Sequence, residues 1–402
     1  PQLAIAIGSQ YPQQHQISGS AEREQENGTR INNYNVGFNL TWEIDFWGRF
    51  RRQIESASAE LDASVASYDE AMVSLVAQVA QSYVLLRTFQ DRLAIAHTNI
   101  KLQAESLRIA QAKLDAGDAS ELDVDQATSL LYSTRATVPA LEISLQQTKN
   151  ALALLLGETP QQFNPLAGTI GAIPTTTPSI ALGMPQDLIR QRPDIRNAES
   201  QLAAQSAQIG FAKTELYPSF SIGGSIGTDA METDDLFSNE GEAWSIFGGF
   251  QWNVFNYGRL QSNVRLQDAL FQQLLVDYQF TVLQAQVDVE NSIVAYLKTY
   301  QQVKEYRRAE TAAQLAVDVS TAQYQDGLVD FNTVITNLNA LATQQDLLAS
   351  SRGEVATNLV QVYRSLGGGW QVRDNQDPVD LLPAEIRETM KLRTDAWEGV
   401  LK

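Results

Sequence analysis

Two long segments that contain neither glycine nor proline constrain this chain most. Each has 68 residues, the first between Gly48 and Gly117 and the second between Gly258 and Gly327. Because glycine and proline are the residues that most often end helices, their absence favours one uninterrupted helix in each segment. At 1.5 Å per residue, each helix would be roughly 100 Å long, several times the diameter of a globular domain. We therefore expect a tubular or rod-like molecule.

The two segments belong to an internal repeat with an offset of 258 − 48 = 210 residues. The matching residues are Trp42 with Trp252, Gly48-Arg49 with Gly258-Arg259, Tyr68 with Tyr278, Val79 with Val289, Ala112 with Ala322, Gly117 with Gly327, and Leu156-Gly157 with Leu366-Gly367. Chance matches would not keep one register over this length. We interpret the two halves as a duplication, which gives an internal two-fold sequence repeat.

Each segment also shows the apolar periodicity of a coiled coil. Apolar side chains of the first copy recur in steps of three and four residues at Leu61, Val65, Tyr68, Met72, Leu75, Val79, Tyr83, Leu86 and Leu93. The same face is apolar in the second copy. Each segment ends at a glycine, after which Ser120 or Asp330 offers an N-cap for a returning helix. The pattern predicts long helical hairpins over 48–156 and 258–366.

Proline positions divide the rest of the chain. Seven of the twelve prolines lie between the two copies, which predicts an irregular connector over 157–183 and a shorter helix over 184–216. A break or kink is expected near Pro139 in the first returning helix but not in the second, which has Ala349 at the matching position. Residues 367–402 form the C-terminal tail, which we group with the connector.

A strict alternation of apolar and polar residues precedes each long segment. In the first copy the apolar positions are Tyr34, Val36, Phe38, Leu40, Trp42 and Ile44. The alternation predicts a long strand with one wholly apolar face. The second copy repeats it over 244–254, although Phe247 interrupts the polar face and Gly248 falls on the apolar one. Shorter alternations at Leu3-Ile5-Ile7 and at 220–226 predict a partner strand in each copy.

These strands predict one β-hairpin in 1–47 and a second in 217–257, with the polar, acidic segments 11–33 and 229–243 as solvated loops. A strand of about ten residues can cross a bilayer when tilted. Four strands cannot close a barrel, and an open sheet edge in hydrocarbon leaves unpaired backbone groups at several kcal/mol each. Two copies would supply eight strands and three would supply twelve. Three copies are favoured only if something must pass through an aqueous lumen.

Composition excludes several classes of function. The net charge is 29 − 47 = −18, which repels nucleic acid. With no cysteine and only His15 and His97, no catalytic residue, cofactor or metal site is predicted. The segment Gly223-Gly224-Ser225-Ile226-Gly227 fits a hydrolase pattern, but no helix follows it. No apolar run predicts a membrane helix. No signal peptide opens the chain, so we expect that a leader was removed or omitted.

Four motifs resemble the outer membrane factor family of TolC-like channels. They are Trp42-Glu43-Ile44-Asp45-Phe46-Trp47-Gly48-Arg49, the stretch from Ala116 to Ala127, the stretch from Val138 to Gly157, and Arg192-Pro193-Asp194-Ile195-Arg196-Asn197-Ala198-Glu199. The last motif is similar to the lipoprotein branch that serves resistance-nodulation-division multidrug efflux pumps. The motifs lie in the family's order, and the resemblance runs from residue 1 to about residue 370.

The resemblance implies a mixed α/β membrane protein and a homotrimer. A twelve-stranded outer-membrane β-barrel, with four strands from each chain, would continue into a long α-helical coiled-coil barrel in the periplasm of a Gram-negative bacterium. The implied function is that of a passive, non-enzymatic exit duct for drugs and other small molecules. The implied partners are two further copies, outer-membrane lipid, a periplasmic adaptor protein and an inner-membrane efflux transporter. The family normally has a lipidated or free N-terminal segment and a helix before the first strand, and we identify neither here.

Candidate site residues form three groups. Candidates for the periplasmic gate or pore are Asp118, Glu121, Asp123, Asp125, Asp326, Asp330, Asn332 and Thr336. Candidates for contact with the adaptor at the hairpin tips are Gly117, Ala119, Ser120, Gly327, Leu328 and Val329. Candidates at the junction of strand and helix are Trp42, Asp45, Trp47, Gly48, Arg49, Trp252, Gly258 and Arg259.

Threefold symmetry would repeat the acidic candidates into rings, which favour cations and could bind divalent ions. Asp118 and Asp330 are preferred because they lie beside the tip glycines, whereas ordinary N-caps and solvated faces are the alternative. Many relatives of this branch carry a carboxylate where this chain has Thr336. At the junction, Asp45, Arg49 and Arg259 are expected to fix the bend, and the tryptophans form either an interfacial belt or core packing.

Two other functions remain open. A type I protein secretion channel would share the architecture, although the efflux-type motifs favour small molecules. A soluble coiled-coil scaffold would explain the heptads and the acidity, but not long alternating strands that end in tryptophan. The scaffold would stay in the soluble extract, whereas the duct would fractionate with outer membranes.

Overall fold

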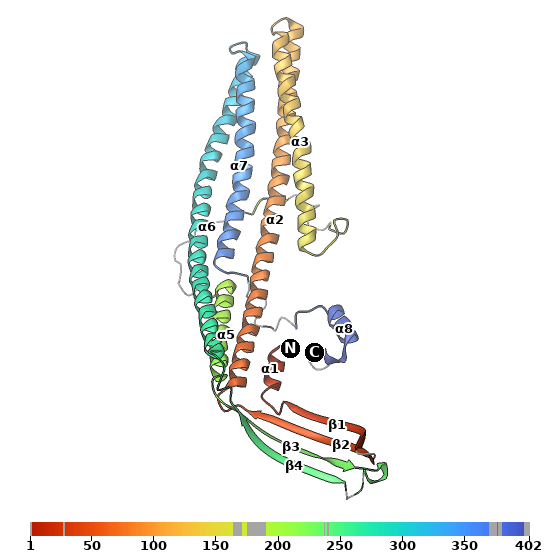
Figure 1. Ribbon diagram of the computed structural model, residues 1–402. Coiled ribbons are helices and arrows are strands. Elements are labelled where there is room, and N and C mark those ends of the chain that lie inside the picture. The colour runs from red at the N-terminus through yellow and green to blue at the C-terminus, as the bar shows by residue number, and fades with distance from the viewer. Residues whose placement is uncertain are drawn as a thin grey trace. The chain divides into compact units, whose positions relative to one another are not determined.

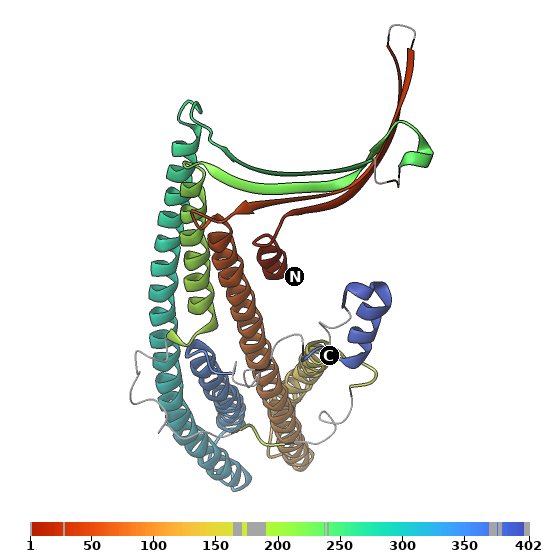
Figure 2. The ribbon, with the colours of Figure 1, turned by 90° about the horizontal axis from the view of Figure 1, so that it is seen from below.

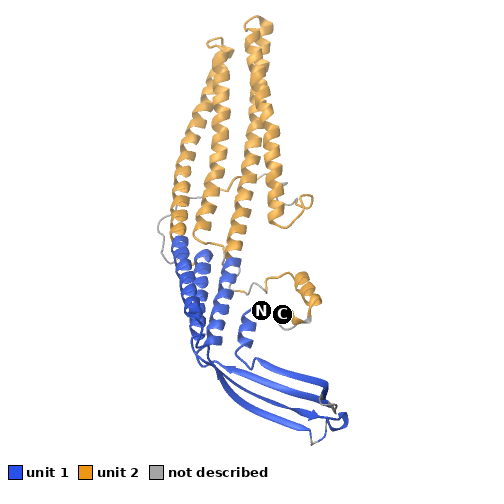
Figure 3. Ribbon diagram, viewed as in Figure 1, with its two compact units in different colours: residues 1–68, 193–282 blue, residues 69–192, 283–402 orange. Residues whose placement is uncertain are grey.

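The computed structural model describes residues 2–26, 29–163, 171–174, 190–236, 238, 241–369, 376 and 380–397. The chain forms two compact units, coloured separately in Figure 3. Residues 1–68 and 193–282 make up the first unit, and residues 69–192 and 283–402 make up the second. Each unit therefore combines segments from both halves of the chain.

The first unit contains a four-stranded antiparallel sheet (Figure 2). Its strands are β1 (Gln14–Glu26), β2 (Thr29–Ile44), β3 (Ser219–Ala230) and β4 (Glu242–Gln251), in that spatial order. The two hairpins pair through β2 and β3, so the sheet joins the two halves of the sequence. β1 and β4 are the outer strands, and each has one edge without a neighbouring strand among the described residues.

The two faces of the sheet differ in polarity. Residues that lie opposite one another in an antiparallel pair share a face. The register places Ile17, Phe38, Ile226 and Trp244 in one row across the four strands, and all four side chains are exposed. We call this side the apolar face and the opposite side the polar face. The alternation in the sequence thus separates apolar from polar side chains, but the apolar ones are not covered within the chain.

The first predicted strand is wrong. Residues 3–7 lie in a helix, α1 (Gln2–Gly8), whose last turn is closed by the Ser9 N–H donating to the Ile5 carbonyl at 3.1 Å. The alternation of Leu, Ile and Ala fits a helix as well, because Leu3 and Ile7 are four residues apart and alanine favours helices. A helix therefore does precede the first strand, contrary to our expectation.

The predicted loop 11–33 is also wrong, because it contains β1 and the first part of β2. β1 pairs with β2 along its whole length, from Gln14 opposite Thr41 to Glu26 opposite Thr29. Local β propensity is low in this polar segment, so the pairing with β2 decides its conformation. In the second hairpin, β4 ends at Gln251, so Trp252 and Val254 follow the strand instead of belonging to it.

Four long helices lie in the segments predicted to be helical (Figure 1). They are α2 (Arg49–Ala116), α3 (Glu121–Leu155), α6 (Arg259–Gln325) and α7 (Phe331–Ser365). The first residues of the matching helices differ by 259 − 49 = 210 and 331 − 121 = 210 residues, which is the offset seen in the sequence. Within the described residues, no helix is long and apolar enough to cross a membrane.

We expected a break or a kink at Pro139. No break occurs, because α3 continues through this residue, and the kink stays a prediction. Proline removes the N–H that would bond the carbonyl four residues earlier, on Arg135. Both positions are exposed, so that carbonyl can be solvated. The helix therefore tolerates the proline without ending.

The shorter helix α5 (Pro193–Thr214) packs in the first unit against the beginnings of α2 and α6. Asn197 Nδ2 donates to the Ala63 carbonyl at 2.8 Å, and Gln205 Nε2 donates to Gln267 Oε1 at 2.8 Å. α5 lies inside the predicted helix 184–216, whose first residues, 184–189, lie outside the described residues, as does most of the connector 157–183. The C-terminal tail contains α8 (Ala384–Arg393) and a short 3-10 turn, η4 (Asp395–Trp397).

The core of the second unit is built from helices of both copies. Near the helix tips, Ala110, Leu130, Val317, Phe331 and Leu338 belong to one buried cluster that draws on α2, α3, α6 and α7. Further apolar clusters lie between α6 and α7 and around the end of α3. The two helical hairpins are therefore held together by a shared core close to their turns.

Arg192, the first residue of the Arg192–Glu199 motif, has a structural role. Its side chain is buried and lies within the second unit, where one guanidinium nitrogen donates to the Ser365 carbonyl at 2.7 Å. Another guanidinium nitrogen lies 3.6 Å from the Asp288 carboxylate. Arg192 thus connects the end of α7 to α6.

Candidate sites at the strand–helix junction and the helix tips

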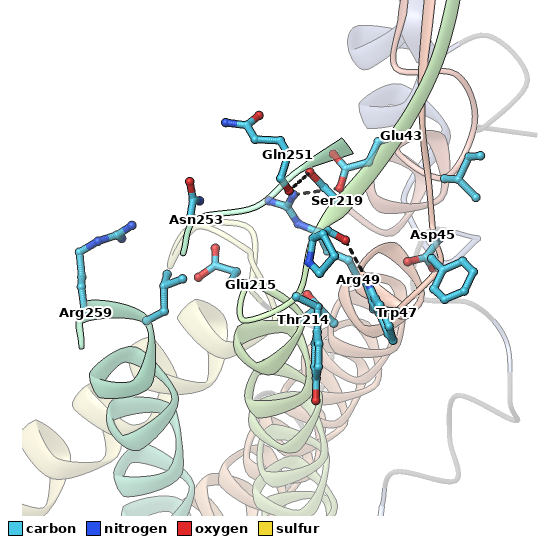
Figure 4. A pocket seen from close by; sticks show the side chains of 15 residues that line it. Glu43, Asp45, Trp47, Arg49, Thr214, Glu215, Ser219, Gln251, Asn253 and Arg259 are labelled. Atoms are coloured by element: carbon cyan, nitrogen blue, oxygen red, sulfur yellow. Dashed lines mark hydrogen bonds and ion pairs between the residues drawn. The ribbon is translucent and has the colours of Figure 1, made fainter. Parts of the chain in front are cut away.

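The first junction is organised by two carboxylates (Figure 4). Asp45 caps α2, because its carboxylate accepts the Phe50 N–H at 3.2 Å and the Arg51 N–H at 3.1 Å. Glu43 Oε1 forms an ion pair with Arg49 at 3.2 Å. Gly48 has a φ of 79°, a conformation that favours glycine, and it allows the chain to turn from strand to helix. These contacts connect the end of β2 to the start of α2, and the predicted role of Asp45 and Arg49 in fixing the bend stays a prediction.

The second junction lacks both carboxylates. The positions that match Glu43 and Asp45 are Asn253 and Phe255, since the offset is 210 residues. Gly258 again has a positive φ, 81°, and its N–H donates to Asn256 Oδ1 at 3.1 Å. Arg259 makes no ion pair or side-chain hydrogen bond among the described residues. The backbone N–H of Arg259 donates to the Asn256 carbonyl at 2.9 Å, and the predicted role of Arg259 in fixing the bend stays a prediction.

The junction tryptophans use their indole N–H groups to bind backbone carbonyls. Trp47 Nε1 donates to the Pro218 carbonyl at 2.8 Å, and Trp252 Nε1 donates to the Leu216 carbonyl at 3.1 Å. Trp42 Nε1 donates to the Gln10 carbonyl at 3.2 Å. Trp42 is 37% exposed and Trp252 is 52% exposed, so neither is packed in the core of this chain.

A pocket of about 250 Å³ lies between these groups in the first unit. Glu43, Asp45, Arg49, Glu215, Tyr217 and Arg259 are among its lining residues. Figure 4 shows Arg259 apart from the Glu43–Arg49 pair. Glu43, Asp45 and Arg49 are used for capping and pairing, and Glu215 Oε2 accepts a hydrogen bond from Asn263 Nδ2 at 3.4 Å, so we describe the pocket as a gap in the junction.

The two helix tips in the second unit have the same backbone turn. Gly117 has a φ of 81° and Gly327 a φ of 73°. The residue after each glycine donates its N–H back into the preceding helix, from Asp118 to the Lys113 carbonyl and from Leu328 to the Gln323 carbonyl, both at 2.8 Å. This pattern of hydrogen bonds satisfies the last carbonyls of the long helices.

Side chains of the tips are mostly exposed. The exposed candidates are Gly117, Asp118, Ser120, Glu121, Asp125, Asp326, Gly327, Leu328, Asp330, Asn332 and Thr336. Ala119, Asp123 and Val329 are half-buried. Leu328 is 72% exposed, which leaves an apolar side chain in solvent at the second tip.

Several polar candidates at the tips bind their own helix. Asp123 accepts the Ser120 N–H at 3.3 Å, which is the hydrogen bond of an N-terminal cap. Thr336 Oγ1 donates to the Asn332 carbonyl at 2.8 Å. Among the described residues, no group of three His, Cys, Asp or Glu side chains could hold a metal ion.

Tyr324 is a tip residue that sequence reasoning missed. It is 5% exposed, and its hydroxyl has no hydrogen-bond partner among the described residues. Its ring contacts the Phe331 ring, with 4.9 Å between centroids, and Lys113 Nζ lies 5.0 Å from the ring centroid. Burial raises the pKa of the Tyr324 hydroxyl above 10.0, and the Asp123 carboxylate raises this pKa further. Tyr324 lies where the first copy has Leu114, so only its polarity within the apolar seam could have singled it out.

A family model described as outer membrane efflux protein matches residues 2–158 and 184–368 of this chain. Among curated relatives, the pyoverdine export outer membrane protein OpmQ of Pseudomonas aeruginosa is 30% identical over 374 residues, which covers 92% of this chain and 78% of OpmQ. The cation efflux system protein CusC of Escherichia coli is 28% identical over 339 residues, which covers 84% of this chain and 73% of CusC.

Solved structures show the same fold. The outer-membrane channel OprN superposes with a TM-score of 0.87 at 31% identity, covering 92% of this chain and 84% of OprN. A structure of CusC superposes with a TM-score of 0.83 at 26% identity, covering 92% of this chain and 86% of CusC. These structures support long helices and a four-stranded sheet in each chain.

Proposed function

The chain belongs to the outer membrane efflux protein family, and from this we propose that it is a passive exit duct of a tripartite efflux pump. The duct would carry small molecules from a periplasmic adaptor and an inner-membrane transporter across the outer membrane to the exterior. The family places the chain in the outer membrane of a Gram-negative bacterium. The trimer, the partners and the gate are parts of the proposal.

The observation that carries the proposal is the sheet with two open edges and one exposed apolar face. An apolar face with tryptophan and phenylalanine is suited to lipid, and a sheet in lipid must close. Adjacent strands in the order β1-β2-β3-β4 are antiparallel, so β4 of one copy and β1 of the next would also be antiparallel. Three copies would close a barrel of twelve strands, wide enough for an aqueous lumen.

The long helical hairpins support the proposal that the duct extends into the periplasm. α2 and α6 have 68 and 67 residues, each roughly 100 Å long, which is far more than a bilayer thickness. Helices of this length would extend the duct through the periplasm as an α-helical barrel. The tips, at residues 117–120 and 326–330, would contact the adaptor and form the gate.

The alternatives are less well supported. OpmQ is named for the export of pyoverdine, CusC for the efflux of cations, and a further relative, TtgI of Pseudomonas putida, for the efflux of toluene. These names favour small molecules over secreted proteins as the cargo. A soluble scaffold does not account for the exposed row of Ile17, Phe38, Ile226 and Trp244 on the apolar face.

The proposal is tested by fractionation and electrical recording. We expect the protein in the outer-membrane fraction, extracted only by detergent and migrating as a trimer. The purified trimer should conduct ions in a planar lipid bilayer. A monomer that conducts, or a protein that stays in the soluble extract, would contradict the proposal.

A further inference from the structure

Phe247 is an aromatic side chain on the polar face of the sheet. The register puts it in one row with Gly223, Thr41 and Gln14. The neighbouring row consists of Gln16, Asn39, Ser225 and Ser245, of which Ser225 and Ser245 share a hydrogen bond of 2.8 Å. Phe247 is therefore a large apolar side chain in a surface of amides and hydroxyls.

Gly223 determines where the ring of Phe247 lies. A Cβ atom at position 223 would come 2.5 Å from Phe247 Cζ and 2.7 Å from the Leu40 carbonyl oxygen. The ring therefore lies across β3, in the space that the missing side chain leaves. Packing of an aromatic ring on a cross-strand glycine stabilises a sheet. It does not cover the ring, however, because Phe247 remains 50% exposed.

The charges on the polar face are all of one sign. At the end of the sheet that bears the connecting loops, Glu22 and Glu24 of β1 and Asp229 of β3 are exposed on this face. At the other end, Glu43 is neutralised by Arg49. Among described strand residues with this orientation there is no lysine or arginine. Positive charge is therefore favoured at the loop end of this face, which lies 22 − 14 = 8 to 24 − 14 = 10 residues along β1 from the row of Phe247.

We infer that Phe247 is a specificity-determining contact for transported organic cations that carry an aromatic or other apolar group. The inference rests on the proposed function, because the polar face becomes the wall of a lumen only when three copies close a barrel. Each copy would then supply one half-exposed ring and the carboxylates of Glu22, Glu24 and Asp229, which make no ion pair among the described residues. A cation is attracted to the face of an aromatic ring, and an apolar group gains by covering it.

The test measures block of the ion current through reconstituted trimers. Benzyltrimethylammonium is the aromatic cation, and benzenesulfonate is an aromatic anion of similar size. We expect the cation to block the unmodified trimer at lower concentration. Phe247→Ala should raise the half-blocking concentration of the cation about five-fold, and Phe247→Trp should restore it. The double variant Glu22→Gln, Glu24→Gln should weaken block by the cation only.

The matched control is Phe250→Ala, which removes a phenylalanine of the same strand from the apolar face. This variant should leave block unchanged. If Phe247→Ala trimers have normal conductance and the same half-blocking concentration as unmodified trimers, the inference is overturned. The proposed function as an exit duct would not be affected by this result. An unmodified trimer that carries no current would instead overturn the proposed function, and the inference with it.

Discussion

Asp45 and Asp123 show what one carboxylate does at the end of a helix in this fold. Asp45 accepts two N–H groups at the start of α2, and Asp123 accepts the Ser120 N–H at the start of α3. The negative charge of Asp123 also raises the pKa of the Tyr324 hydroxyl. A carboxylate at a tip can thus be a cap and an electrostatic neighbour at once.

Tyr324 provides the prediction at this scale. Its folded pKa is raised, so its protonated form contributes stability that is complete below pH 10 and is lost as pH rises through the folded pKa. Tyr324→Phe should abolish that alkaline loss and change stability at pH 7 by no more than about 1 kcal/mol, since the hydroxyl has no hydrogen-bond partner in the part of the chain that the structure describes. Thermal unfolding from pH 7 to pH 11 measures both effects.

Tyr324→Ala is the control for packing, and it should cost about 3–5 kcal/mol at every pH because it empties part of the tip core. A Tyr324→Phe variant that loses stability at alkaline pH as steeply as the unmodified protein would contradict the assignment. In addition, Asp123→Asn should lower the pKa of Tyr324.

Single residues could be predicted from the sequence only where local chemistry decides their role. Asp45 follows a strand and Arg49 begins the helix after it, and the sequence alone predicts that both take part in the bend. Tyr324 could not be predicted, because heptad spacing treats a tyrosine as one more apolar residue. Arg259 was expected to act like Arg49, but the positions that match Glu43 and Asp45 are Asn253 and Phe255, so the second copy does not repeat the Glu43–Arg49 ion pair.

At the scale of elements, helices were easier to predict than strands. A helix is stabilised by contacts within a few residues, so the segments without glycine or proline were sufficient for α2 and α6. β1 depends on β2 for its whole length, and its polar sequence carries no strand signal of its own. For the same reason, five alternating residues at 3–7 could not distinguish a strand from α1.

Pro139 and Ala349 form a matched pair that tests the helices. Pro139→Ala restores an N–H to an exposed turn of α3 and should stabilise the protein by about 1–3 kcal/mol. Ala349→Pro makes the reverse change in α7, where residue 349 is buried, and should cost at least about 3 kcal/mol. Denaturation of the detergent-solubilised protein measures both. A neutral Ala349→Pro would show that α7 tolerates a proline as α3 does.

For the whole molecule, the acidic tips provide a test of the gate. Asp118 and Asp330 are exposed beside Gly117 and Gly327, and no ion pair neutralises them among the described residues. If threefold symmetry arranges them in rings, Asp118→Asn and Asp330→Asn should each lower the ratio of K⁺ to Cl⁻ permeability about two-fold. Single-channel recording measures the ratio.

Glu388→Gln, on α8, is the control for a change of charge away from the tips. Unchanged cation preference and conductance in both aspartate variants would remove Asp118 and Asp330 from the gate. The family and the fold could be predicted from motifs that span the chain. The residues that would face a lumen could not be predicted, because in the proposed trimer they depend on contacts between copies.

The pairing of β2 with β3 also determines the order in which the chain can mature. Phe38 must meet Ile226, which follows it by 226 − 38 = 188 residues. The β1–β2 hairpin is synthesised first. We expect its apolar face to stay exposed until β3 and β4 have been synthesised and can pair with it. An isolated hairpin is only marginally stable and prone to aggregate. Biogenesis of this protein is thus expected to depend on a holding chaperone that shields the early hairpin.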